Sequence, residues 1–216
     1  MEKLIICGLG VRVPEETTLE TLQALADCRV VYTDLADKKA REWLSEYCRN
    51  LKDAPAPAEI LKEAKKGGVG LAVWGNPQSS SRLSRDVELG AQKEGIEFRV
   101  YGAISPIGSV FARSVSFLGG DYGYQGIQAY DVGTVLEDAK AATNELPIVL
   151  YSEKSGPAEW RKAVDALAPN YPAGHKVRLF RPDGESETEL SSLKAGERCA
   201  VLIPPAKPLE TIKNKW

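Results

Sequence analysis

Short apolar runs alternate along the chain with segments in which apolar residues recur every three or four positions. A continuous apolar run predicts a buried strand, and the wider spacing predicts a helix with one buried face. In the first half, strands are predicted at residues 4–7, 28–32, 69–74 and 98–101. Helices are predicted around residues 19–25, 37–47, 57–66 and 83–91, and again from residue 107. The alternation indicates a largely parallel sheet covered by helices on both faces.

The second half repeats this logic with predicted strands at residues 146–152, 175–181, 187–190 and 198–203. The helix between the first two has a single apolar stripe made of Trp160, Ala163, Val164 and Leu167. Pro182-Asp183-Gly184 is a turn signal that joins two neighbouring strands, which adds an antiparallel component. The expected fold class is therefore α/β, with two α/β domains and a mixed sheet in the second.

Two local patterns set boundaries within this organisation. Thr17 and Glu20 have the spacing of a capping box, so we expect them to start the first helix. Residues 119–126 contain too many glycines to continue a helix. We therefore expect an N-terminal domain over residues 1–118, a glycine-rich hinge over 119–126 and a C-terminal domain over 127–216.

Charge and composition narrow the classes of partner. The chain of 216 residues has 28 basic and 30 acidic side chains, so its formal charge of −2 gives no reason to expect nucleic acid or an anionic membrane surface. No apolar run approaches the roughly 20 residues of a membrane-spanning helix. Met1-Glu2-Lys3 leads straight into a strand instead of a signal peptide, which favours a cytoplasmic protein.

The cysteines and the single histidine do not suggest a metal site. Cys7, Cys28, Cys48 and Cys199 are far apart and include no Cys-x-x-Cys pair, so we interpret them as reduced core residues. His175 has no companions at ligand spacing. We therefore expect no metal.

The candidate chemistry lies where strands end. Gly75-Asn76-Pro77 and Gly102-Ala103-Ile104-Ser105-Pro106 each follow an apolar run and precede a helical pattern. In an open α/β sheet, ligands bind beyond the carboxyl ends of the strands, so a small-molecule site is the first hypothesis. Gly8-Leu9-Gly10 follows the first strand, where it fits either close approach to a ligand or a tight turn. Val13 replaces the third glycine of the dinucleotide fingerprint, which disfavours classical dinucleotide binding.

In the Gly75-Asn76-Pro77 turn, each residue has a possible role. Gly75 permits close backbone approach, Asn76 offers a donor and an acceptor, and Pro77 fixes the exit direction of the chain. The alternative is an ordinary turn between strand and helix. If the site is real, Gly75→Val is expected to abolish binding and leave the fold intact.

A serine hydrolase is a further hypothesis. Ser79, Ser80 and Ser81 offer hydroxyl groups, but no Gly-x-Ser-x-Gly surrounds them, and His175 falls in a predicted strand. Helix capping explains these serines better. Loss of His175 with esterase activity intact would remove the hydrolase hypothesis.

Taken in order, the Gly-x-Gly loop, the Gly-Asn-Pro turn and Gly102-Ala103-Ile104-Ser105 resemble the tetrapyrrole methylase superfamily of S-adenosylmethionine-dependent enzymes. The resemblance spans nearly the whole chain, and residues 24–32 are similar to the family's passage from first helix to second strand. Residues 202–207 and 34–44 look more like the branch with borosin-type peptide backbone N-methyltransferases. That branch has an arginine and tyrosine group before the Gly-Asn-Pro turn, and residues 54–66 contain neither type.

The resemblance implies two domains that hold S-adenosylmethionine in a cleft, release S-adenosylhomocysteine, and assemble as a homodimer. The implied cofactor-binding residues are Gly8, Gly10, Gly75, Asn76, Ser79, Ser105, Pro106, Tyr151, Ile203 and Pro204. If the acceptor must lose a proton, candidate bases are Tyr32, Asp34 and Tyr101. The acceptor would be a tetrapyrrole-like small molecule or a peptide. The departures from the family pattern leave an alternative, a cofactor-binding regulatory or partner protein without catalysis.

Overall fold

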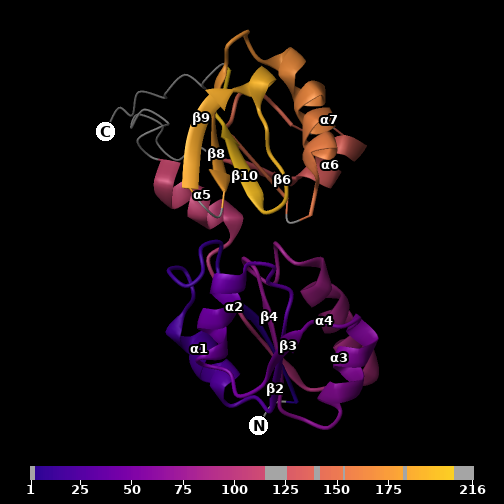
Figure 1. Cartoon of the computed structure of the whole chain (residues 1–216). Coiled ribbons are helices and arrows are strands. Elements are labelled where there is room, and N and C mark those ends of the chain that lie inside the picture. Colours follow the sequence, from indigo (N-terminus) through magenta and orange to yellow (C-terminus); the bar gives the residue numbers. More distant parts are fainter. Residues whose placement is uncertain (1–2, 115–125, 139–141, 153, 182–183, 207–216) are drawn as a thin grey trace, which may run out of the picture. The chain divides into compact units, whose positions relative to one another are not determined.

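The computed structural model describes residues 3–114, 126–138, 142–152, 154–181 and 184–206. The chain forms two compact units, residues 1–106 and 107–216. Each unit contains one five-stranded sheet with helices on both faces (Figure 1). The predicted α/β class, with a parallel first sheet and a mixed second sheet, is confirmed.

The first unit is built on a sheet whose strands are all parallel. Their order across the sheet is β3-β2-β4-β1-β5. The strands are β1 (Leu4–Gly8), β2 (Val30–Thr33), β3 (Leu51–Asp53), β4 (Val69–Val73) and β5 (Phe98–Tyr101). Parallel pairing brings the carboxyl ends of all five strands to the same edge of the sheet. We call this edge, with the loops that follow the strands, the carboxyl edge.

Helices cover both faces of the first sheet (Figure 1). One face packs against α1 (Leu19–Ala26) and α2 (Lys38–Ser45) through side chains that include Leu25, Leu44 and Cys7. The other packs against α3 (Pro57–Ala64) and α4 (Arg82–Glu94), with Ile60 and Val87 among the buried residues. Burial on both faces explains why β1 and β4 are apolar throughout.

The second unit has the strand order β6-β7-β10-β8-β9. Only β6 and β7 run parallel, and the other neighbours are antiparallel. The strands are β6 (Gln128–Asp131), β7 (Ile148–Ser152), β8 (Lys176–Arg181), β9 (Gly184–Glu189) and β10 (Cys199–Ile203). The helices are α5 (Pro106–Ser114), α6 (Val132–Glu137) and α7 (Pro157–Leu167), with short 3₁₀ turns at Ala168–Asn170 and Leu190–Ser192.

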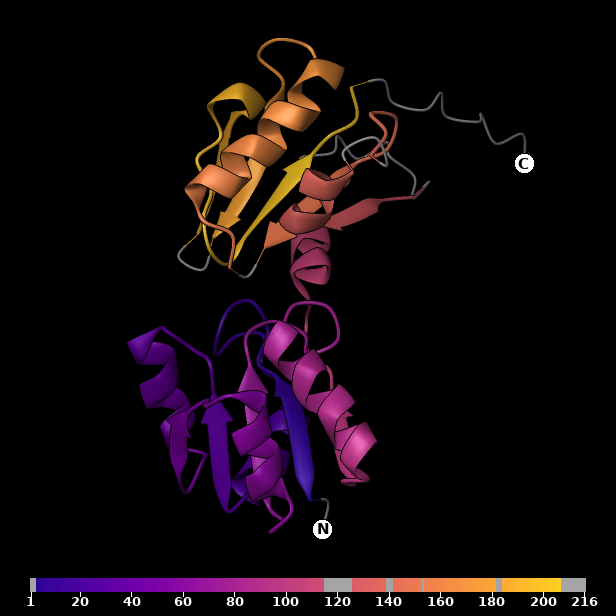
Figure 2. The same cartoon turned by 90° about the vertical axis from the view of Figure 1, so that its right-hand side faces the viewer.

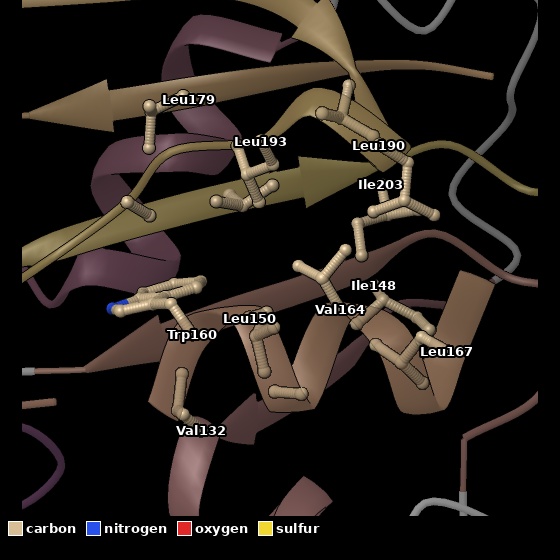
Figure 3. Close-up of a cluster of buried hydrophobic side chains, with 14 of the residues drawn as sticks. Val132, Ile148, Leu150, Trp160, Val164, Leu167, Leu179, Leu190, Leu193 and Ile203 are labelled. Carbon is tan, nitrogen blue, oxygen red and sulfur yellow. The ribbon is translucent and has the colours of Figure 1, made fainter. Parts of the chain in front are cut away.

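The larger hydrophobic core of this unit lies between its sheet and α7. Figure 2 views the unit from the side of α7. Trp160 is 1% exposed, and its indole donates a hydrogen bond to the Gly196 carbonyl at 2.9 Å. The close-up in Figure 3 shows Trp160, Val164 and Leu167 of α7 beside Leu150 and Ile203 of the sheet. The stripe predicted from the sequence is thus the buried face of α7.

Three elements and one cap differ from the sequence prediction. The strands β3 and β6 and the helix α6 were not expected, because they are short and β3 and β6 are not fully buried. The capping box on Thr17 is wrong: Thr18 caps α1 by accepting from the Thr21 N–H at 3.1 Å. The Thr17 hydroxyl instead donates to the Leu9 carbonyl at 2.7 Å.

The division between the units also differs from the expected hinge. Ile107 and Val110 of α5 pack with Val149 and Leu202, so α5 belongs to the second unit. Most of the expected hinge, residues 119–125, lies outside the described residues. The expected turn at residues 182–183 lies outside them too.

All four cysteines are buried free thiols, as predicted. Burial raises the pKa of Cys28 to about 12 and that of Cys48 to about 11, and it raises the pKa of Cys7 further still.

We expect native protein at pH 8 to react with Ellman's reagent at least about a hundredfold more slowly than denatured protein, because thiolate is the reacting form. Unfolded cysteine thiols ionise near pH 8.5, whereas the buried thiols ionise only at about pH 11 or above. The free energy of unfolding should therefore also fall as the pH rises from about 8.5 toward about 11. Rapid labelling of the native chain would contradict this burial.

Candidate functional site

Three loops meet at the carboxyl edge of the first sheet. They follow β1, β4 and β5, which are adjacent in the sheet with β1 in the middle. The loops are residues 9–18, 74–81 and 102–105. Adjacent parallel strands therefore bring together the Gly-x-Gly, Gly-Asn-Pro and Gly-Ala-Ile-Ser segments that the sequence singled out.

The first two loops are joined through two glycines. The Gly10 N–H donates to the Gly75 carbonyl at 3.1 Å, and the Gly75 N–H donates back to the Gly10 carbonyl at 2.8 Å. Both residues are buried and have positive φ, 81° for Gly10 and 70° for Gly75. The left-handed conformation explains why glycine occupies both positions. The reciprocal bonds fix the two loops against each other.

Asn76 joins the second loop to the third. Its side-chain Nδ2 donates to the Ala103 carbonyl at 2.7 Å, and its Oδ1 accepts from the Gln78 N–H at 2.9 Å. The Asn76 N–H donates to Ser80 Oγ at 3.0 Å. The Asn76 side chain therefore serves as both donor and acceptor, to Ala103 and from Gln78.

Gly8 lies where all three loops converge. A Cβ atom at this position would lie 2.5 Å from the Gly75 carbonyl oxygen, 2.7 Å from Pro77 Cδ and 2.8 Å from Ala103 Cβ. No side chain fits at such distances, so the close approach of the loops requires glycine here. The absence of a side chain at Gly8 therefore allows the loops to approach one another closely.

The same reasoning corrects the expected effect of a substitution at Gly75. A Cβ atom there would lie 2.5 Å from Ser80 Oγ, and the positive φ adds backbone strain. The expectation that Gly75→Val would leave the fold intact is therefore wrong. The space beside Gly75 is filled by the protein's own serine.

The first loop is held from inside by Trp74 and by Glu16, a residue that sequence reasoning did not single out. Glu16 is 7% exposed, and its Oε2 accepts from the N–H groups of Val11 at 2.9 Å and Arg12 at 3.2 Å. The Trp74 indole donates to the Val11 carbonyl at 3.0 Å. A glutamate just before a helix usually suggests helix capping, so only the fold reveals that Glu16 organises a loop.

The other first-unit residues on the predicted cofactor list lie at the same edge. The N–H of Ser79 donates to the Asn76 carbonyl at 3.1 Å, and the Ser79 side chain is half-buried. Ser105 is half-buried at the end of the third loop, and Pro106 is buried at the start of α5. The structure thus brings Gly8, Gly10, Gly75, Asn76, Ser79, Ser105 and Pro106 together at the carboxyl edge.

The three candidate bases are not brought together. Tyr32 packs with the core beneath α3 and α4, whereas Tyr101 packs with the core beneath α1 and α2, so their rings lie on opposite faces of the sheet. Their strands are three positions apart, about 14 Å at the usual strand spacing. Asp34 follows β2 at the carboxyl edge, and both its carboxylate oxygen atoms are buried. The Arg99 guanidinium lies 5.1 Å from the Tyr101 ring centroid.

The second-unit candidates are also divided between two faces. In the antiparallel pair of β7 and β10, Tyr151 is opposite Ala200, whereas Ile203 is opposite Ile148. The Tyr151 side chain packs with the core beside α5, and Ile203 belongs to the core beside α7. Pro204 follows β10, and its carbonyl is 3.0 Å from the Nε2 atom of His175.

The serine and histidine residues that suggested a hydrolase make structural contacts. Ser81 caps α4 by accepting from the Ser84 N–H, as predicted. The ring of His175 contacts Tyr171, with 4.7 Å between ring centroids. In the described part of the chain, no group of three or more histidine, cysteine or acidic side chains is arranged to hold a metal ion. Nor is any described helix both long and apolar enough to cross a membrane.

The fold and this edge define an α/β protein with a glycine-lined meeting point of three loops, the type of place where such sheets bind small molecules. Residues 3–184 match the family model of the tetrapyrrole (corrin/porphyrin) methylases, so the chain belongs to that family. The resemblance predicted from the sequence is confirmed. A search of curated proteins gave no match.

Solved structures share this fold. The methyltransferase CobJ has a TM-score of 0.65 at 17% identity, with 95% of each chain covered. The uroporphyrin-III C-methyltransferase of Thermus thermophilus, in complex with S-adenosylhomocysteine, has a TM-score of 0.70 at 15% identity, with 93% of this chain and 91% of that chain covered. At these identities, the likeness supports the fold.

We expect Gly8→Ala to lower the free energy of unfolding of the first unit by about 1–3 kcal/mol, because the new methyl group overlaps the loops at residues 74–81 and 102–105. Gly102→Ala is the matched control, since a Cβ there would lie 3.4 Å from its nearest neighbour, Asn76 Nδ2. Hydrogen exchange in β1 and β4 measures the effect. Equal protection in the two variants would show that Gly8 is not the point of convergence.

Proposed function

We propose that this chain is an S-adenosylmethionine-dependent methyltransferase that binds its cofactor with the three loops of the carboxyl edge. The observation that carries the proposal is their convergence, through Gly8, Asn76 and the Gly10–Gly75 pair, in a member of the tetrapyrrole methylase family. The structure of the uroporphyrin-III C-methyltransferase in complex with S-adenosylhomocysteine supports the choice of cofactor.

The groups available at this edge suit such a cofactor. The N–H groups of Ala103 and Ile104 have no hydrogen-bond partner within the ranges that the structure describes, so they can donate to a ligand. Ile104 is 44% exposed and offers apolar surface beside them. Small-molecule sites typically combine apolar surface with a few such backbone donors.

The chain's own residues would act mainly by positioning. S-adenosylmethionine supplies an activated methyl group, so the protein needs to align the acceptor with it and exclude water. Loops tied by reciprocal hydrogen bonds hold donors in place before a ligand arrives, which lowers the ordering cost of binding. This explains how a methyltransferase can work without a conspicuous acid–base pair.

The acceptor is a tetrapyrrole-like small molecule or a peptide. Where the acceptor must lose a proton, we propose Asp34 as the first candidate base, because it follows β2 at the carboxyl edge, and Tyr32 and Tyr101 as the others. In the second unit, Tyr151, Ile203 and Pro204 stay predicted cofactor residues. The homodimer that the resemblance implies and the cytoplasmic location that the N-terminal sequence favours likewise stay predictions, and analytical ultracentrifugation tests the first.

A second candidate function is binding of S-adenosylmethionine or S-adenosylhomocysteine without catalysis, in a regulatory or partner protein. The separation of Tyr32 and Tyr101 onto opposite sheet faces favours it. So does the absence of arginine and tyrosine from residues 54–66.

We expect micromolar binding of S-adenosylhomocysteine in calorimetric titration of the wild-type chain. Asn76→Ala should weaken it at least about tenfold, because the second and third loops lose their connecting hydrogen bond. Asn144→Ala is the matched control: it removes a 2.8 Å bond from Asn144 Nδ2 to the Asn170 carbonyl, far along the chain in the second unit. No binding by folded wild-type protein would refute the proposed function.

Turnover separates the two candidate functions. If the chain is an enzyme, methyl-labelled S-adenosylmethionine should transfer its label to a tetrapyrrole or peptide, and Asn76→Ala should slow this transfer at least about tenfold. Tight cofactor binding with no transfer to a panel of both acceptor classes would instead support the regulatory protein.

A further inference from the structure

Arg12 stands out among the residues of the carboxyl edge because of its charge. The loops at residues 74–81 and 102–105 contain no ionisable side chain, and the loop at residues 9–18 contains Arg12, Glu15 and Glu16. Arg12 is therefore the one cationic side chain in the three loops. It is two residues from Gly10, whose backbone pairs with Gly75, so its Cα atom is within about 8 Å of that junction.

A buried carboxylate holds this arginine in place. Glu16, whose side chain is 6% exposed, accepts from Arg12 Nε at 3.2 Å and from the Arg12 N–H at 3.2 Å. The Val11 N–H donates to the same carboxylate, and the Trp74 indole holds the Val11 carbonyl. The backbone and the side chain of Arg12 are thus both anchored by Glu16.

The anchoring leaves the outer face of the guanidinium available. Glu16 contacts Nε, and no acceptor for Nη1 or Nη2 is found among the residues that the structure describes. The Arg12 side chain is 43% exposed. A guanidinium fixed through Nε presents two parallel N–H donors, the arrangement that binds a carboxylate through both oxygens.

We propose that Arg12, positioned by Glu16, binds a carboxylate of the ligand at the carboxyl edge. This inference rests on the proposed function and deepens it by naming the group that the site recognises. The carboxylate has two possible sources, the amino-acid end of the cofactor and an acidic acceptor. Arg12 is a binding residue in this scheme, and Glu16 is a positioning residue.

The test is calorimetric titration of the wild type and Arg12→Ala with three probes. S-adenosylhomocysteine contains the carboxylate, 5′-methylthioadenosine keeps the nucleoside and sulfur without it, and uroporphyrin III, added at saturating S-adenosylhomocysteine, represents an acidic acceptor. Arg29→Ala is the matched control, because Arg29 pairs with Glu63 at 2.7 Å and precedes β2, at the opposite edge of the same sheet.

We expect Arg12→Ala to weaken a carboxylate ligand at least about tenfold and to leave 5′-methylthioadenosine unchanged. Loss confined to S-adenosylhomocysteine assigns the carboxylate to the cofactor, and loss confined to uroporphyrin III assigns it to the acceptor. Affinities equal to those of Arg29→Ala for all probes overturn the proposal, as does equal weakening of 5′-methylthioadenosine. If the wild type binds no S-adenosylhomocysteine, the proposed function itself is refuted. This result differs from equal affinities of the two arginine variants, which overturn only the role of Arg12.

Two further variants guard against a folding defect. Arg12→Lys keeps the charge without the planar fork, so it should recover only part of the affinity, and it carries the test if Arg12→Ala unfolds. Glu16→Gln should weaken the same probe as Arg12→Ala while 5′-methylthioadenosine affinity holds. A purely structural role for Glu16 would instead lower the affinity for both adenosine probes together.

Discussion

The arrangement of the carboxyl edge depends on one constraint, that the central strand β1 ends in a residue without a side chain. Gly8 is in van der Waals contact distance of the loops from both neighbouring strands, and a single methyl group there would overlap Gly75, Pro77 and Ala103. Because these loops approach so closely, Asn76 can reach the Ala103 carbonyl. A local steric condition at the end of one strand thereby sets the geometry of three loops.

The two sheets differ in what they can do with their strand ends. In the first, parallel pairing brings every carboxyl end to one edge, so loops distant in sequence become neighbours. In the second, β7 and β10 run antiparallel, and their carboxyl ends lie at opposite edges. Tyr151 and Ile203, each near the end of its strand, are separated for that reason. Sheet direction therefore explains why the first unit concentrates its candidate residues and the second does not.

Long apolar patterns in the sequence predicted helices and strands well, because burial determines which residue types occupy those positions. The strand β4 is apolar and buried on both faces, and the stripe on α7 matches its buried side. The short elements β3, β6 and α6 have no such signal, since three to six residues give too few positions for a period to show. The strands β3 and β6 are placed by pairing with β2 and β7, and α6 is placed by packing in the core of the second unit, and no local pattern encodes either.

The location of the candidate site could be predicted from the sequence, but the contacts that each residue makes there could not. Sequence reasoning placed Gly75 and Asn76 at the end of a strand, and the structure puts them there. It expected Gly75→Val to leave the fold intact, although a side chain there would overlap Ser80. It took Thr17 for a helix cap, although its hydroxyl holds the Leu9 carbonyl. Such roles depend on contacts across loops, so residue type and spacing do not determine them.

The charge distribution of the carboxyl edge bears on the proposed chemistry. A methyl group leaves a positively charged sulfonium, and transfer to a neutral acceptor spreads that charge in the transition state. Surroundings with few charges favour such spreading over surroundings that stabilise a concentrated cation. The two loops at residues 74–81 and 102–105 are uncharged, and the first loop pairs its arginine with Glu16. Under the proposed function, these three loops would divide two tasks: Arg12 would recognise an anionic part of the ligand, and the two uncharged loops would lie nearer the reacting atoms.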